Sequence, residues 1–279
     1  MASRIRLMTV DCGEYKRMMM FTVRNFWPGK RGKKFQPTSE TQKKCNERNR
    51  MRRISDLLHL NFTPNDIAFH PTYEDRWLPE SFEDALKDRR NLVKRLKRAW
   101  AKETGRGEKE CKIFMVSAQS STGRVHHHMI MSGGLSFDQI TKIWGKGHCS
   151  PRNLEFDENG IVGLANYIAK ESERKTKRSW ATTKNFEKPE YDKRDGAVTN
   201  KEAAYIDDHP EDAGFVEEMF PGWGVAEIIP TSRTEEEGEE KEHPFGHFIE
   251  IRLYRKDNRY FRRDKSGYIH YGYREREDI

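Results

Sequence analysis

The feature that most constrains the fold is a pair of strand-forming runs joined by a turn. The runs CKIFMVSAQ at residues 111–119 and RVHHHMIM at residues 124–131 combine apolar and β-branched residues, a composition typical of strands. The residues between them, SSTG, favour a turn. The pattern predicts an antiparallel hairpin, so the domain that contains it must be built around a sheet.

Helices are expected on both sides of this hairpin in the sequence. Four segments carry apolar residues at helical spacing, at 39–62, 81–100, 135–147 and 160–174. Short strands are expected at 65–73 and near Leu154. The order of elements predicts an α+β fold in which helices pack on one face of an antiparallel sheet.

The ends of the chain have a weaker pattern. A strand is expected at 18–26, and two more at 224–230 and 247–255, with the acidic run TEEEGEEKE between the last two. We therefore expect an N-terminal segment (1–38), a main domain (39–195) and a C-terminal appendage with an acidic loop (196–279).

Composition narrows the class of protein. The chain has 279 residues, of which 34% are hydrophobic and 35% charged, and its net charge is +7. Basic residues concentrate at 30–53, 87–112 and 174–184, which favours a polyanion such as nucleic acid as the partner. Solvated helix faces are the alternative explanation of the same charge.

Several classes are not supported by the sequence. The four cysteines are widely spaced, so neither a zinc knuckle nor a disulfide framework is expected. No apolar run approaches the roughly 18 residues of a membrane span, and no signal peptide is recognised. We expect a soluble, cytoplasmic protein without a membrane partner.

The histidine triplet in the second strand of the hairpin suggests a metal site. Residues i and i+2 of a strand point to the same side, so His126 and His128 project together and His127 projects oppositely. Gln119, on the paired strand, is the candidate third ligand, because an amide oxygen suits Mg²⁺ or Mn²⁺. The alternative is that the histidines are inert.

A tyrosine and a lysine lie one turn apart on the predicted helix at 160–174. Tyr167 and Lys170 fall along a face next to the apolar stripe. A phenol is almost wholly protonated at neutral pH, so a nucleophilic tyrosine needs a nearby cation or metal. The alternative is a half-buried helix tyrosine beside a lysine that extends to solvent.

Taken together, these motifs resemble the HUH superfamily of single-stranded DNA endonucleases, and within it the rolling-circle replication initiators of phages and plasmids. The resemblance covers roughly residues 40–190, through FTPNDIAFHPTYED, SAQSSTGRVHHHMIM and NYIAKESERKTKRSWATTKN. The family often has Glu where this chain has Gln119. Its first motif usually reads Thr-Leu-Thr, where this chain has Ala68, Phe69 and His70, which leaves His70 open as a metal or phosphate contact.

The resemblance implies a fold and a reaction. The fold would be an RRM-like antiparallel sheet with helices on one face. A metal ion held by His126, His128 and Gln119 would polarise a phosphate that Tyr167 attacks, leaving a 5′-phosphotyrosine bond and a 3′-hydroxyl primer. Four basic residues are candidates for phosphate contacts: Arg124, Lys170, Arg178 and Lys184. Trp180 is a candidate for base stacking, or a core residue.

Further features concern the biological setting. Some members of the superfamily have a second nucleophilic tyrosine on the same helix. This chain has Glu171 one turn beyond Tyr167, so the resemblance implies a single-tyrosine enzyme. The resemblance implies origin DNA as a partner. The chain has no phosphate-binding loop of the G-x-x-x-x-G-K-[ST] type, so a host helicase and a host polymerase are also expected as partners. A relaxase or transposase of the same superfamily, or a nucleic-acid-binding protein without catalysis, are the alternatives.

Overall fold

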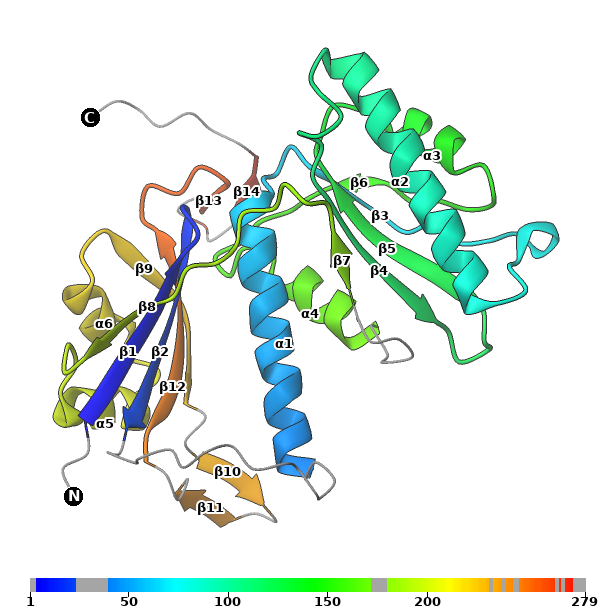
Figure 1. Ribbon diagram of the computed structural model, residues 1–279. Helices are drawn as coiled ribbons and strands as arrows, with labels where there is room; N and C mark the ends of the chain where they lie inside the picture. Colours follow the sequence, from blue (N-terminus) through cyan, green and yellow to red (C-terminus); the bar gives the residue numbers. More distant parts are fainter. Residues whose placement is uncertain are drawn as a thin grey trace.

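The computed structural model describes residues 4–23, 40–171, 180–230, 233–236, 239–242, 246–263, 266 and 269–272. These residues form helices and antiparallel sheets, which confirms the predicted α+β class. Two sheets have five strands each, in the orders β8-β1-β2-β12-β9 and β6-β3-β5-β4-β7. In Figure 1 they lie on opposite sides of helix α1.

The second of these sheets contains the histidine triplet, and we call it the histidine sheet. Its strands are β3 (Ile67–Phe69), β4 (Ile113–Gln119), β5 (Val125–Met131), β6 (Arg152–Asn153) and β7 (Ala181–Thr182). The predicted hairpin is formed by β4 and β5, which pair along their whole length. Strand β3 then pairs with the other edge of β5.

One face of the histidine sheet is covered by α2 (Phe82–Thr104) and α3 (Phe137–Trp144). Helix α2 begins where the sequence predicts, because the side chain of Ser81 accepts a hydrogen bond from the amide of Asp84. Trp100 of α2 and Trp144 of α3 are both buried in the apolar layer against the sheet. The predicted helix cover on one face holds for α2 and α3 (Figure 1).

The opposite face carries α1 (Glu40–Asn61) and α4 (Val162–Glu171). Phe114 and Ile130 of the sheet pack there against α1 and α4 residues such as Leu58 and Ile168. Both faces of β4 and β5 are rich in apolar side chains, so both need cover from water. Helix α4 leaves part of this second face open, and the histidines lie in that part.

The other five-stranded sheet joins the two ends of the chain, and we call it the terminal sheet. Its strands are β1 (Arg4–Asp11), β2 (Tyr15–Val23), β8 (Asp192–Asp195), β9 (Trp223–Pro230) and β12 (Phe248–Arg255). Helices α5 (Asn200–Asp208) and α6 (Ala213–Met219) pack against it. The predicted strands at 224–230 and 247–255 are confirmed as β9 and β12.

This sheet corrects the predicted division of the chain. Strand β2 pairs with β12, so the segments 1–38 and 196–279 contribute to one unit, and β8 of the predicted main domain joins them. The physical reason is burial: Met18 and Met20 are completely buried against Ile249 and Ile251, and neither strand could cover that apolar face alone.

Short elements complete the fold: η1 (Asp75–Trp77), β10 (Arg233–Glu236), β11 (Glu239–Glu242), β13 (Phe261–Arg263) and β14 (Ile269–Tyr271). The predicted acidic loop contains the β10–β11 hairpin. Strands β13 and β14 form a second hairpin. In the part of the chain that the structure describes, no helix has the length and apolar character to span a bilayer.

Candidate active site

Three histidine side chains converge on the open face of the histidine sheet. They are His126 and His128 of β5 and His70, which directly follows β3. Each offers a ring nitrogen, and the three nitrogens lie within 4.8 Å of one another. The His70 ring stacks on the His128 ring at a centroid distance of 4.3 Å, and the His126 ring is 4.9 Å from the His70 ring.

The strand pattern explains why these three meet. His126 and His128 alternate with His127, so they share a face as the sequence predicts. Ala68 of β3 pairs with Ile130 of β5, which puts Ala68 on that face too. His70 is two residues beyond Ala68 and therefore returns to the same side. His70, which the sequence left open as a metal or phosphate contact, therefore supplies the third imidazole.

Gln119 does not belong to this group, and its predicted role as the third ligand is corrected. It pairs with Val125, whereas His126 pairs with Ala118 and His128 with Val116. Directly paired residues share a face of the sheet, so Gln119 faces the side of Val125 and His127. Its amide donates a hydrogen bond to the Gly123 carbonyl in the hairpin turn, at 2.6 Å.

The three-histidine cluster has the protonation and the free ligand atoms that a metal site needs. Burial lowers the pKa of His70 to about 4 and that of His128 to about 3, with a further contribution from the neighbouring imidazoles. Both rings are thus neutral at pH 7, the state that ligates metals. Their Nε2 atoms are buried and find no hydrogen-bond partner among the described residues. A divalent cation would satisfy both atoms.

Tyr167 stands beside this cluster. Its ring lies edge-on to the His128 ring, with the centroids 5.2 Å apart. Helix α4 buries Ala165, Ile168 and Ala169 in the core, which turns Tyr167 to the open side, where it is 50% exposed. A hollow of about 380 Å³ is lined by His70, His128 and Tyr167 together. The hydroxyl is therefore accessible to a ligand that reaches the histidines.

Of the residues predicted to contact phosphate, two are exposed lysines and one is an arginine bonded to other residues of the protein. Lys170 is exposed one turn after Tyr167 on α4, and Lys184 is exposed after β7. Arg124 is held by Asp75 at 2.5 Å and by the Tyr73 carbonyl at 2.8 Å.

The other two residues predicted to contact DNA are Arg178 and Trp180. Arg178 lies outside the described residues. Trp180 is half-buried and stacks on Phe114 at 5.8 Å, which favours the core role over base stacking.

His127 takes a structural position on the opposite face of β5. Its Nε2 lies 3.0 Å from the Tyr73 hydroxyl and its Nδ1 lies 2.8 Å from the Ser117 hydroxyl, which also accepts from Arg89. Burial and the Arg89 charge lower the pKa of His127 to about 3. These bonds tie β5 to β4 and to the segment after β3, and so fix the two strands that carry the three-histidine cluster.

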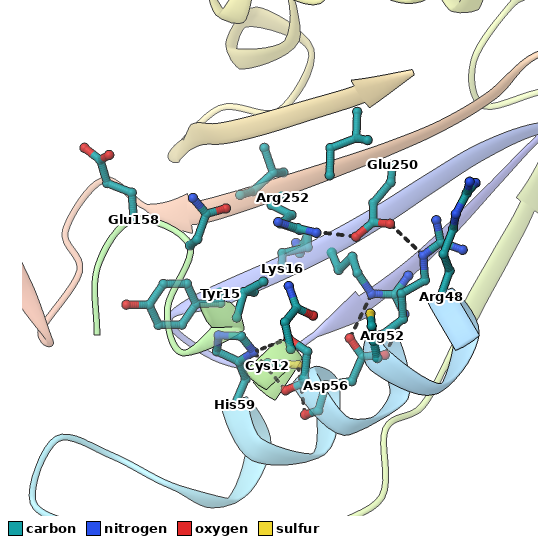
Figure 2. A pocket seen from close by; sticks show the side chains of 18 of the residues that line it. Cys12, Tyr15, Lys16, Arg48, Arg52, Asp56, His59, Glu158, Glu250 and Arg252 are labelled. Carbon is teal, nitrogen blue, oxygen red and sulfur yellow. Dashed lines mark hydrogen bonds and ion pairs between the residues drawn. The ribbon is translucent and has the colours of Figure 1, made fainter. Parts of the chain in front are cut away.

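A second cavity, of about 340 Å³, lies between α1 and the terminal sheet (Figure 2). Four of its charged groups bind one another in pairs: Arg17 forms a two-pronged ion pair with Asp56, and Arg52 binds Glu250 at 2.6 Å. His59 is bonded at both ring nitrogens, to the Ser55 carbonyl and the Ile161 amide. Burial lowers its pKa to about 4. The ion pairs around this cavity link α1 to the terminal sheet, so these buried groups have little freedom to bind a ligand.

No protein-family model, curated protein or solved structure matches the chain. The case for function therefore depends on the geometry of the three histidines and Tyr167. Sequence reasoning missed Arg152, which lines the same hollow from β6. A two-residue edge strand leaves no periodic pattern that would have identified it.

Proposed function

We propose that the protein is a metal-dependent endonuclease that cleaves single-stranded DNA by covalent catalysis through Tyr167. The observation that carries the proposal is the pair of buried Nε2 atoms of His70 and His128, without a hydrogen-bond partner among the described residues, beside the half-exposed Tyr167 ring. A metal site next to an accessible phenol fits phosphoryl transfer to tyrosine.

The metal would be held by His70, His126 and His128. A bound divalent cation would supply Lewis-acid polarisation of the scissile phosphate. Three imidazole nitrogens favour a transition-metal ion over Mg²⁺, which prefers oxygen ligands, and Mn²⁺ is the transition-metal ion of the two expected from the sequence. This narrows the expectation from the sequence, where the Gln119 oxygen suited Mg²⁺ or Mn²⁺.

The phenolic oxygen of Tyr167 is the nucleophile in this proposal. It forms a bond to phosphorus while the bond from phosphorus to the 3′ oxygen breaks. The tyrosine proton passes to solvent and the departing 3′ oxygen takes up a proton. The products are a 5′-phosphotyrosine linkage and a free 3′-hydroxyl. Because one phosphodiester bond is exchanged for another, attack by a 3′-hydroxyl reverses the reaction without ATP.

A replication role follows from the resemblance of the sequence motifs to rolling-circle initiators. The 3′-hydroxyl would prime synthesis by a host polymerase, with a host helicase opening the duplex. A relaxase or transposase would use the same chemistry on a different DNA. A binding protein without catalysis would use the basic surface alone, and it would form no covalent bond to DNA.

The test is capture of the covalent adduct. The full chain is incubated with Mn²⁺ and a library of labelled single-stranded oligonucleotides with a randomised centre. Adducts are separated on a denaturing gel and their DNA is sequenced. Wild type should form an adduct, and Tyr167→Phe, His128→Ala and wild type in EDTA should not. Tyr205→Phe is the matched control, because Tyr205 is also exposed, at 39%, and lies on α5 beside the terminal sheet.

Two outcomes would overturn the proposal. One is that wild type forms no adduct with any library member. The other is that Tyr167→Phe forms as much adduct as wild type. DNA binding that is weakened by salt without any adduct would instead indicate the binding protein.

A further inference from the structure

A groove leads away from Tyr167 along helix α4. The hollow lined by His70 and His128 shares three lining residues, Arg152, Leu164 and Tyr167, with an adjoining hollow of about 290 Å³, which we call the second hollow. The second hollow continues past Gly163 to Tyr271. The two hollows therefore meet at the tyrosine and extend from it in different directions.

Tyr271 reaches this groove from the other end of the chain. It belongs to β14, where it pairs with Phe261 of β13. Phe261 and the adjacent Tyr260 are buried in the same apolar cluster as Ile161, which precedes α4. The hairpin is thus anchored beside α4, and the Tyr271 ring is presented half-exposed, at 53%.

The charges along the groove differ between its two ends. Arg152 is exposed on β6, next to the strand that leads to His70. Glu155 and Asp157 line the second hollow and not the one beside the histidines, and their carboxylates repel a phosphate. The end near the three-histidine cluster therefore suits a phosphate, and the end near Tyr271 suits an uncharged aromatic base.

Gly163 forms part of the groove between these ends. It is exposed on α4, one turn before Tyr167. A Cβ atom built on Gly163 meets no atom within 4 Å, so nothing in the described fold requires glycine there. Alanine is the better helix former. Glycine does, however, permit a ligand to approach the backbone closely.

We propose that this groove binds the nucleotide adjacent to the scissile phosphate, with its phosphate on Arg152 and its base stacked on Tyr271. The inference rests on the proposed function and adds a positioning site to it. The bound nucleotide would hold the strand so that the neighbouring phosphate lies between the three-histidine cluster and Tyr167.

The first test is a double-mutant cycle between protein and DNA. An adduct-forming oligonucleotide is made with an abasic site at each position in turn, and its dissociation constant is measured by fluorescence anisotropy. Stacking of a base on an aromatic side chain contributes about 1–3 kcal/mol, or about 5- to 150-fold in affinity. Tyr271→Ala should weaken binding by a factor in this range, and Tyr271→Phe should not. At one abasic position next to the cleavage site the loss from Tyr271→Ala should disappear.

The second test uses Gly163 and Arg152. Gly163→Ala should raise the melting temperature or leave it unchanged, and yet weaken binding of the oligonucleotide. A purely structural glycine would give the opposite result for stability. Arg152→Ala should weaken binding and reduce its salt dependence, whereas Arg152→Lys should keep both.

Failure of this inference is distinguishable from failure of the proposed function. If wild type forms the adduct but Tyr271→Ala, Gly163→Ala and Arg152→Ala all bind as wild type does, the groove is not a nucleotide site. An abasic scan in which Tyr271→Ala is equally costly at every position overturns the stacking role. If wild type forms no adduct, the proposed function itself fails.

Discussion

Metal binding at the three-histidine cluster should stabilise the fold in a way that depends on His70. Without a cation, the Nε2 atoms of His70 and His128 stay buried and unpartnered among the described residues, and each such group costs about 1–3 kcal/mol. A cation present at about 100 times its dissociation constant adds about 2.7 kcal/mol to the free energy of unfolding. At about 2–4 °C per kcal/mol for a chain of about this size, the melting temperature should rise by roughly 5–11 °C.

The assay is differential scanning calorimetry of the apo protein with increasing Mn²⁺. His70→Ala should lose most of this rise, because it removes one of three ligands. Gln119→Ala is the matched control, and it should keep the rise, because Gln119 faces the other side of the sheet. Loss of the rise in Gln119→Ala with its retention in His70→Ala would refute the ligand set derived from the strand register.

Three further predictions concern the metal, the strand support and pH. Adduct formation should reach half its maximal rate at a lower concentration of Mn²⁺ than of Mg²⁺, and equal half-saturating concentrations would contradict an all-imidazole site. His127→Leu should lower the free energy of unfolding by about 1–3 kcal/mol in urea titrations, because it removes one hydrogen bond from each of the buried hydroxyls of Ser117 and Tyr73. Burial lowers the pKa values of His59 and His127 to about 4 and 3. As the pH falls, these histidines are therefore protonated in the unfolded chain before they are protonated in the folded one. The stability they contribute is complete above about pH 6.5 and is lost as the pH falls toward 4. A melting temperature that does not change from pH 7.5 to 5 would contradict this.

The local parts of the site could be predicted from the sequence because they depend on short-range periodicity. Alternation along one strand is enough to put His126 and His128 on one side and His127 on the other. Helical spacing is likewise enough to separate Tyr167 from the buried stripe of α4. Neither inference requires knowledge of which strands are neighbours.

The identity of the third ligand in the proposed site depends on which residues of neighbouring strands are paired. The sequence leaves this pairing open until the turn is defined. The hairpin pairs Ala118 with His126 and Val116 with His128, so the residues of β4 that face the histidines carry no ligand atoms. A third ligand for the proposed metal would have to come from the strand on the other side of β5. His70 takes that place through the pairing of β3 with β5, two segments that are far apart in the sequence.

The terminal sheet and the groove were beyond prediction for a similar reason. Met18 of β2 lies against Ile251 of β12, and no local pattern indicates that the first and last strands of a chain will pair. Tyr271 reaches α4 only because its hairpin is anchored by Phe261 in the core. The β2–β12 pairing and the placement of Tyr271 beside α4 are both long-range contacts. The sequence pattern of the segments involved does not indicate that they meet.

In the proposed reaction Tyr167 forms a covalent bond to DNA. The most direct measurement is mass spectrometry of the adduct after digestion by protease and nuclease, which identifies the residue that carries the DNA. We expect a nucleotide joined through its 5′ phosphate to Tyr167 and a matching oligonucleotide that ends in a 3′-hydroxyl. A linkage at another residue, or cleavage without any linkage, would contradict it.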